Sequence, residues 1–386
     1  MIESISIKNF KSILDLKLPL GRFNVLIGEN GCGKSNILES ISYGSAALSD
    51  KLDNEYLSLR GIRVTDARFM TSAFDEQSND TINITFNDGK EAFKCSINAK
   101  TNTPFILSPP DDKNKNKYDI LITVGSKGGQ IDIGSRDTMG IIGENKQDIK
   151  GQVTQLGKYD KFNTNKDIES FVFYCPEESS LRTFRDEYQL LPLGRKGEGL
   201  FRYLKTLAQT DKGKQTLEEI KENLVLLDWF DDIKIPTDSL SNDYTISIKD
   251  RYIHETISFF DQRSTNEGFL YLLFYLTLFI SEETPCFFAI DNIESSFNPK
   301  LCRRLIEILI KLAQEHNKQV IITTHNPSVL DGLNIDNDDE RLFVIRRNLD
   351  GHTKVDRVQY KNEKKLSIPL SEAWVKGYLG GLPENF

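Results

Sequence analysis

The chain has 386 residues, enough to bury a large core, and its 38% hydrophobic and 27% charged residues are ordinary for a globular protein. A net charge of −8 excludes a protein that is basic all over, although a local basic patch could still meet nucleic acid. The five cysteines form no CxxC pair and the histidines number four, so we expect no structural zinc site, no disulfide framework and a cytoplasmic location. The N-terminus does not resemble a signal peptide, and no apolar run reaches the roughly 18 residues that a membrane span needs.

The N-terminal segment predicts a strand, a glycine-rich turn and a helix. Ile5 and Ile7 alternate with polar residues, which is the period of a β-strand. A second apolar run, FNVLIG at 23–28, leads directly into a glycine-rich turn, and residues 36–48 after it have helical spacing. Strand, turn and helix in this order are the context that a phosphate-binding loop requires.

The segment from about residue 75 to residue 168 has a different composition. Short β-branched pieces alternate with turn sequences such as NDGK and GENKQDIKG, which predicts an elaborated antiparallel region with exposed, mobile loops. The run DDKNKNK at 111–117 could contact nucleic acid, but such runs are usually solvated loops, and we interpret it as one.

The C-terminal half alternates helices with apolar strands. Strands are predicted at 171–175, 285–291 and 319–325, and helices at 269–280 and 301–316. This alternation predicts a mostly parallel sheet that is covered on both faces. No heptad pattern is sustained, which excludes a long coiled coil.

The sequence GENGCGKS, from Gly28 to Ser35, matches the phosphate-loop pattern G-x-x-x-x-G-K-[ST]. Glycines let the backbone wrap around a phosphate so that N–H groups point inward, and the following helix adds the positive end of its dipole. Lys34 can reach the β- and γ-phosphates of ATP, and the Ser35 hydroxyl can complete the shell of Mg²⁺. A chance glycine turn is the alternative, and the strand and helix around it argue against that. The predicted ATP-binding residues of this loop are Asn30, Gly31, Cys32, Gly33, Lys34, Ser35 and Asn36.

Two later strands also end in functional residue types. Asp291 ends the apolar run CFFAID and is predicted to make the second magnesium contact. His325 ends the run VIITTH and could donate to the γ-phosphate and sense its loss. A lone histidine would be structural, but this one is the third strand end that converges on a single site.

These elements together resemble the ATP-binding-cassette type heads of the SMC, RecF and OLD group. The resemblance rests on SIKNFKSI, GENGCGKSNIL, IDNIESSFNP and TTHNPSVLD, and it covers roughly the first fifty and the last hundred and thirty residues. It implies an α/β P-loop ATPase head with a mixed, mostly parallel sheet, an antiparallel β subdomain and a helical lobe. It also implies that two heads sandwich two ATP molecules with Mg²⁺, each site taking a Ser-x-Gly signature from the other subunit.

The signature maps onto STNEGFLYLLF, just before the long apolar helix. Gly268 fits, and its N–H could bind a γ-phosphate, while Asn266 stands in the serine position and can still donate a hydrogen bond. A simple helix cap is the alternative. With this resemblance we divide the chain into an N-terminal part of the ATPase lobe (1–75), a β-rich insertion (76–185), a helical lobe with the signature (186–268) and a C-terminal part of the ATPase lobe (269–386).

Asn292 occupies the position after Asp291, where related ATPases carry the glutamate that activates water. An amide can orient water but cannot accept its proton, and losing a general base typically costs ~10²–10⁴ in rate. Glu294 could swing inward as a base, although related heads have a glutamate there besides the catalytic one, which favours a structural role. We therefore predict intact ATP binding, with hydrolysis slow or absent.

A narrower resemblance points to a biological role. FYCPEESSLRTF, PLGRKGEGLFRYL and the terminal GYLGGLPENF resemble the PtuA-type ATPases of Septu anti-phage systems, including retron-associated forms. This implies an HNH-type nuclease partner similar to PtuB, since the chain has no HNH or TOPRIM site of its own, and DNA contact through the complex. The alternative is a RecF/SMC-like DNA-repair ATPase that clamps DNA on an ATP-dependent dimer; the acidic charge and Asn292 count against it, and a degenerate signature counts against a transporter ATPase.

Overall fold

The computed structural model describes residues 1–65, 69–72, 74, 81–99, 103–106, 121–122, 133–134, 165–183, 190–236, 246–254, 259–359 and 368–382. The DDKNKNK run and most of the loops predicted to be mobile lie outside these described residues.

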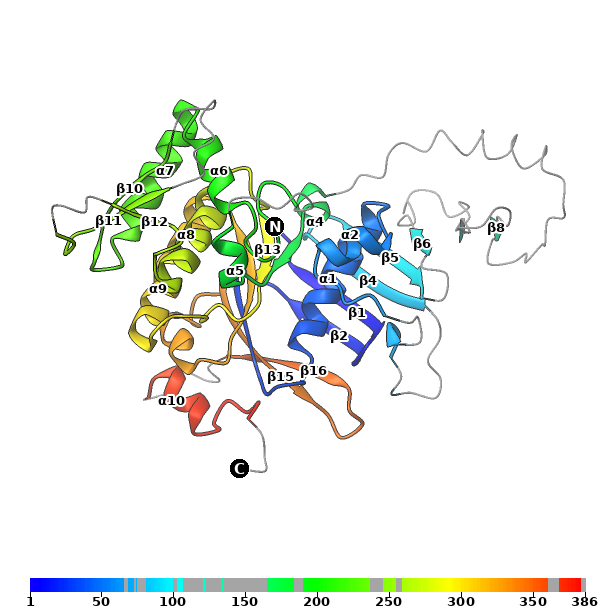
Figure 1. Cartoon of the computed structure of the whole chain (residues 1–386). Coiled ribbons are helices and arrows are strands. Elements are labelled where there is room, and N and C mark those ends of the chain that lie inside the picture. The colour runs from blue at the N-terminus through cyan, green and yellow to red at the C-terminus, as the bar shows by residue number, and fades with distance from the viewer. Residues whose placement is uncertain are drawn as a thin grey trace, which may run out of the picture.

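A six-stranded sheet forms the centre of the molecule, with the strand order β16-β15-β3-β14-β13-β9 (Figure 1). Its strands are β16 (Thr353–Val358), β15 (Glu340–Arg347), β3 (Phe23–Ile27), β14 (Gln319–Thr323), β13 (Phe287–Ile290) and β9 (Val172–Tyr174). Neighbouring strands from β15 to β9 are parallel, and β16 pairs antiparallel with β15 at one edge.

Both faces of this sheet are buried. Phe288 and Ile290 of β13 belong to one hydrophobic cluster, while Phe287 and Ala289 belong to the other. Because side chains alternate along a strand, an entirely apolar run buries one cluster on each face. This explains why the strands read as continuous apolar runs in the sequence.

An antiparallel sheet, with the order β2-β1-β4-β5-β6, lies on one side of the centre. Its strands are β1 (Ser4–Phe10), β2 (Ile13–Pro19), β4 (Thr81–Asn87), β5 (Ala92–Asn98) and β6 (Thr103–Ile106). The helix α1 (Lys34–Leu48) lies between the two sheets, because its side chains share one cluster with both of them. A separate two-stranded pair consists of β7 (Leu121–Ile122) and β8 (Ile133–Gly134).

The helical side covers the other face of the parallel sheet (Figure 1). It contains α6 (Leu200–Leu207), α7 (Asp211–Leu224), α8 (Glu267–Ile280) and α9 (Pro299–Glu315). A three-stranded sheet of β10 (Phe230–Lys234), β11 (Ser247–Asp250) and β12 (Phe260–Asp261) adjoins these helices. Every residue of α8 from Phe269 to Ile280 is buried, so its apolar run belongs to the core, and no helix among the described residues could cross a membrane.

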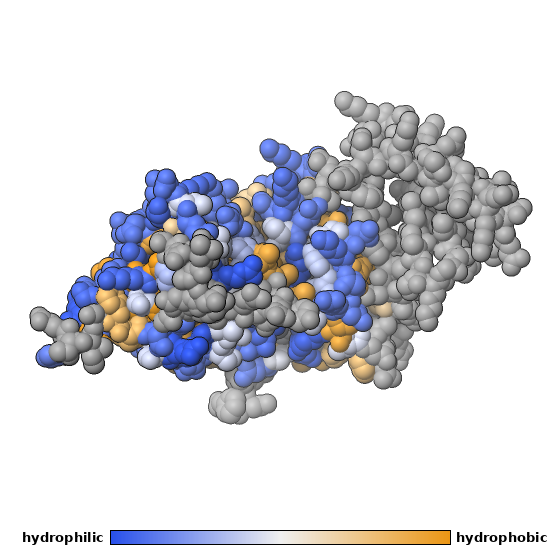
Figure 2. Space-filling model, turned by 45° about the horizontal axis from the view of Figure 1, so that its top comes forward, coloured by the Kyte–Doolittle hydropathy of each residue, from blue (hydrophilic) through white to orange (hydrophobic). Residues whose placement is uncertain are grey.

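Short helices complete the chain: α2 (Asn54–Leu59), α4 (Lys166–Glu169), α5 (Glu178–Leu181), the 3₁₀ helix η2 (Pro327–Gly332) and α10 (Leu370–Val375). Trp374 of α10 is buried, so this end of the described chain packs on the core. The face drawn in Figure 2 is mostly hydrophilic, with hydrophobic residues in small separate groups.

The predicted architecture is confirmed. A mixed, mostly parallel sheet, an antiparallel sheet and a helical side are all present, and no coiled coil occurs in the described part of the chain. The β-rich segment contributes to both sheets, since β4 and β5 pair into the antiparallel sheet with β1, while β9 joins the parallel sheet beside β13.

Gly44 provides a test of how closely α1 approaches the antiparallel sheet. A Cβ at Gly44 would lie 2.8 Å from Cγ2 of Ile84 and 2.9 Å from Cε2 of Phe86, and both of these side chains are fully buried. Alanine in place of a helical glycine usually adds roughly 0.5–1 kcal/mol of stability, whereas overpacking a core costs ~1–3 kcal/mol. We expect the cost of overpacking to exceed the gain in helix stability, so that Gly44→Ala lowers the free energy of unfolding measured in urea.

The control is Lys311→Ala on the exposed face of α9, which should change the free energy of unfolding by less than about 0.5 kcal/mol. A Gly44→Ala protein more stable than the parent would contradict the close approach of the helix and the sheet.

Candidate nucleotide-binding site

The predicted site residues follow neighbouring strands of the parallel sheet. The phosphate loop follows β3, Asp291 follows β13, and His325 lies two residues after β14. Because parallel strands end at one edge of a sheet, these segments converge there. Burial lowers the pKa of the Lys34 ammonium overall, while the nearby carboxylates of Asp291 and Glu294 act to raise it.

The conformation of the phosphate loop requires glycine at two positions. Gly28 and Gly33 have φ angles of 148° and 111°. A Cβ at Gly28 would lie 2.2 Å from the carbonyl oxygen of Ile345, and one at Gly33 would lie 2.2 Å from Oγ1 of Thr353. Both the backbone angles and the packing against β15 and β16 therefore exclude other residues.

The β15–β16 hairpin holds the outside of the loop. Thr353 Oγ1 donates to the carbonyl oxygen of Cys32 at 3.0 Å, and Arg347 Nε donates to that of Gly31 at 2.9 Å. Ser12 lies 2.7 Å from Thr353 between their hydroxyls and also accepts from Nδ2 of Asn36 at 2.7 Å. Sequence reasoning missed Ser12, Arg347 and Thr353, because their distance along the chain gives no local signal of this contact.

The contacts of the loop divide its predicted ATP-binding residues into two groups. Cys32 is buried, so it can offer a ligand only its backbone, and the Asn36 side chain is occupied in holding Ser12. Asn30 and Gly31 are exposed. The loop therefore presents backbone N–H groups, Lys34 and Ser35 to a ligand.

Lys34 is bent back over its own loop. Its Nζ donates to the carbonyl oxygens of Gly28 at 2.7 Å and Glu29 at 3.0 Å. The side chain is buried, and this burial lowers the pKa of its ammonium group. A desolvated ammonium held by carbonyl oxygens can exchange them for phosphate oxygens, which carry more negative charge.

Thr323 fixes the turn that contains Asp291. Its hydroxyl donates to Oδ1 of Asp291 and accepts from the backbone N–H of Asn292 at 2.9 Å. The N–H of Asp291 donates to the carbonyl oxygen of Tyr174 in β9 at 2.8 Å. Asn292 itself has a φ angle of 54°, a left-handed conformation that asparagine tolerates better than most residues. Asp291 thus keeps a fixed position, with one of its oxygens left for a ligand.

Glu294 connects the Asp291 turn to the His325 loop. Its Oε1 accepts from the backbone N–H of His325 at 2.8 Å, and its Oε2 is buried without a hydrogen-bond partner. A carboxylate in this position holds the segment that carries His325. Its use as the base remains a prediction. A swing of the Glu294 carboxylate toward an attacking water would break that hydrogen bond.

The signature residues cap a helix. Asn266 is the N-cap of α8, and its side-chain oxygen accepts from the N–H of Phe269 at 2.9 Å. Its NH₂ group is the part that could still serve a ligand. Ser296, in the turn after Asp291, donates to Glu267 at 2.7 Å, so this helix end lies beside that turn. Asn266 and Gly268 do not line the cavity that contains Ser35 and Asp291, and a role in binding nucleotide would need a second copy of the chain.

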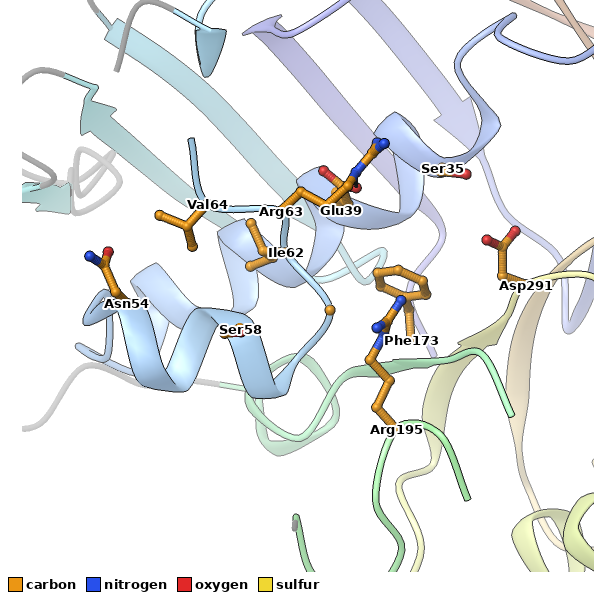
Figure 3. A pocket seen from close by; sticks show the side chains of 11 residues that line it. Ser35, Glu39, Asn54, Ser58, Ile62, Arg63, Val64, Phe173, Arg195 and Asp291 are labelled. Atoms are coloured by element: carbon orange, nitrogen blue, oxygen red, sulfur yellow. Dashed lines mark hydrogen bonds and ion pairs between the residues drawn. The ribbon is translucent and has the colours of Figure 1, made fainter. Parts of the chain in front are cut away.

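A cavity of about 720 Å³ opens beside the loop (Figure 3). Six of its lining residues are Ser35, Glu39, Arg63, Phe173, Arg195 and Asp291. Ser35 and Asp291, the two residues predicted to share a magnesium ion, lie at one end of it on different elements, and their role in binding magnesium stays a prediction.

Ser35 and Asp291 fit a magnesium ion that arrives with a nucleotide. The described residues contain no cluster of three or more histidines, cysteines, aspartates or glutamates that could hold a metal alone. Mg²⁺ at nucleotide sites typically takes one or two protein oxygens and completes its shell with phosphates and water. Bound there, it would neutralise charge on the β- and γ-phosphates.

Comparisons with known proteins agree with this fold. A family model described as an AAA ATPase domain matches residues 1–330. An SMC head bound to the C-terminal winged-helix domain of ScpA is 13% identical with a TM-score of 0.56, covering 93% of this chain and 98% of that one. An SMC head domain with an extended coiled coil, bound to the C-terminal domain of ScpA from Pyrococcus furiosus, is 11% identical with a TM-score of 0.52, covering 93% and 96%. At these identities the likeness shows the SMC head-like α/β fold alone, and no protein of curated function matches the sequence.

The pKa of His325 depends on the charges of its neighbours in the site, so it can be used to test their proximity without any ligand. Burial and then the charge of Lys34 lower its pKa, while Glu294 and Asp291 raise it. The pKa of its imidazole therefore lies below the usual range. We expect Lys34→Met to raise the pKa of His325 and Glu294→Gln to lower it, as measured by NMR titration of the histidine ring signals.

Lys311→Met, which removes an exposed lysine of α9, is the matched control and should leave the pKa of His325 unchanged. The same titration for Lys34→Met and the parent would contradict the convergence of these residues.

Proposed function

We propose that this chain, which belongs to the AAA ATPase domain family, is an ATP-binding head that hydrolyses its nucleotide slowly or not at all and regulates a separate nuclease. ATP use, usually with Mg²⁺, follows from the family and the fold. One observation supports the rest: Ser35 and Asp291 line the same cavity and Lys34 directly precedes Ser35 in the phosphate loop, while Asn292 stands where related ATPases carry a base.

The geometry around Asn292 supports slow hydrolysis. The nearest carboxylate along the chain after Asp291 is Glu294; its Oε1 accepts from the N–H of His325, and its Oε2 is buried away from solvent. Asp291 accepts a hydrogen bond from Thr323 and would be occupied by Mg²⁺. Neither carboxylate is therefore poised to take a proton from an attacking water.

Nucleotide that stays bound can still control assembly. In the arrangement that the sequence resemblance implies, two heads bury ATP and Mg²⁺ between them, with Asn266 and Gly268 of one copy facing the phosphates held by the other. Ligand buried only in the dimer stabilises it by mass action, so the dimer population follows the ATP concentration. The exposed N-terminus of α8, with free amide donors on Asn266, suits this role.

Replacing Asn292 tests whether a missing base limits hydrolysis. We expect Asn292→Glu to raise steady-state ATP turnover, by at most the ~10²–10⁴ that a general base supplies. The left-handed backbone at this position costs glutamate about 1–2 kcal/mol, which reduces the gain but does not cancel it.

Asn292→Gln is the matched control, because it adds the same length without a base and should leave turnover at the parent level. Lys34→Ala should abolish ATP binding and gives the background rate. The proposal would be overturned by a parent protein that already turns over as fast as Asn292→Glu and loses this activity in Glu294→Gln.

The proposed partner is an HNH-type nuclease similar to PtuB, in a Septu-like defence complex that contacts DNA. The support is the sequence resemblance, together with a site better suited to sensing ATP than to consuming it. While ATP is abundant, the ATP-bound heads hold the nuclease inactive. Depletion of nucleotide during infection releases it.

Copurification with the nuclease, followed by DNA cleavage assays, tests this role. We expect millimolar ATP with Mg²⁺ to suppress cleavage by the complex, and Lys34→Ala to make cleavage independent of ATP, because the ammonium that binds phosphate is gone. Cleavage that is insensitive to ATP in the parent complex would exclude a sensor. DNA-stimulated ATP hydrolysis by the chain alone would favour the DNA-repair alternative instead.

A further inference from the structure

Arg195 is fixed to the end of the strand next to Asp291. It lies in the segment before α6, and its carbonyl oxygen accepts from the N–H of Cys175 at 2.9 Å, directly after β9. β9 pairs with β13 in a register that places Tyr174 opposite Ile290. Main-chain contacts therefore place Arg195 beside the sheet edge where the nucleotide-site residues meet.

The side chain of Arg195 is held in one place. Its guanidinium lies over the ring of Phe173, 4.5 Å from the centroid. On another side is Gly61, which has a φ angle of 86°. A Cβ at Gly61 would lie 2.2 Å from Nε of Arg195 and 2.7 Å from Cε1 of Phe173, so glycine leaves the space that the guanidinium uses. Such packing orients the planar group before any ligand binds.

The positive charge of Arg195 has no carboxylate partner in the part of the chain that the structure describes. Nearby cations each have a carboxylate: Lys196 pairs with Glu177 at 3.0 Å, and Arg63 pairs with Glu39. Among the described residues Arg195 has no ion pair, and its Nε is buried without a hydrogen-bond partner. A partly desolvated charge without a partner is costly, so an anion in the cavity would be strongly stabilised.

The cavity that Arg195 lines also contains Ser35 and Asp291, and Figure 3 shows Arg195 and Phe173 facing the space between Asp291 and Arg63. When a triphosphate lies in the loop, Ser35 would hold the accompanying Mg²⁺, which would neutralise charge on the terminal phosphates. The γ-phosphate is thus the group that extends from the loop toward this end of the cavity. The loop N–H groups, by contrast, surround the β-phosphate, which ADP also has.

We propose that Arg195 binds the terminal phosphate of a nucleoside triphosphate and thereby makes the site prefer triphosphate over diphosphate. This rests on the proposed function, because it takes the loop as the nucleotide site. A guanidinium can bind two phosphate oxygens at once, which an ammonium cannot do in a fixed plane. Lys34 then anchors the nucleotide in both states, and Arg195 reads whether the γ-phosphate is present.

Calorimetric titration of the full chain with Mg²⁺ and either ADP or the non-hydrolysable triphosphate AMP-PNP tests the assignment. In Arg195→Ala we expect the affinity for AMP-PNP to fall roughly tenfold to a hundredfold, the value of charge-assisted hydrogen bonds, and the affinity for ADP to stay within about twofold. Arg195→Gln keeps the length of the side chain and should give the same pattern, and it decides the matter if Arg195→Ala does not fold.

Lys196→Ala is the matched control, since it removes the adjacent cation, whose partner is Glu177, and should change neither affinity. Lys34→Ala should lose both nucleotides; if the parent binds neither, the proposed nucleotide site itself is wrong. If the parent binds both through Lys34 while the Arg195 variants keep the parental ratio of affinities, the assignment of Arg195 is overturned and the nucleotide site stands.

Discussion

The double burial of the parallel sheet is the constraint on which the rest of this protein depends. Strands such as β13 and β14 are apolar along their whole length because each places alternate side chains into different cores. Parallel pairing then forces their C-terminal ends to one edge, where the chain must leave the sheet. The phosphate loop, the Asp291 turn and the His325 loop are three such exits. Their meeting follows from how the core is covered.

At that edge, hydrogen bonds fix the relative positions of the segments that leave the sheet. Thr323 joins the end of β14 to the turn after β13, and Glu294 joins the same turn to the segment after β14. The hairpin of β15 and β16 supports the phosphate loop from outside. Because neighbouring strands are linked in this way, a change at the nucleotide would be felt at every exit of the sheet together. A site linked in this way can signal to the rest of the protein whether a nucleotide is bound, even when hydrolysis is slow.

Lys34 and Arg195 differ in physical character. Lys34 is a flexible ammonium that its own loop solvates through carbonyl oxygens. Arg195 is a planar group that an aromatic ring and a glycine backbone hold in orientation. The ammonium of Lys34 suits a contact that forms with any nucleotide. The fixed guanidinium of Arg195 suits a contact that forms only when a phosphate occupies one particular position. Asn292 is consistent with these proposed roles, because slow hydrolysis would leave the terminal phosphate bound.

The sequence by itself determined the fold class, the phosphate loop and the strand ends at Asp291 and His325, because each depends on local pattern. Apolar runs specify buried strands, and glycine spacing specifies a loop that can wrap around phosphate. The helix-cap alternative at Asn266 was also visible, since capping is a local property. Only the tertiary structure decided what supports these elements. Ser12 and Thr353, which are far apart in the sequence, contact each other beside the phosphate loop. Glu294 binds the backbone of His325 and does not line the cavity. Arg195 is placed in the cavity by its packing against Phe173 and Gly61. Such contacts join residues that no spacing rule connects, because they arise where separate elements pack against each other.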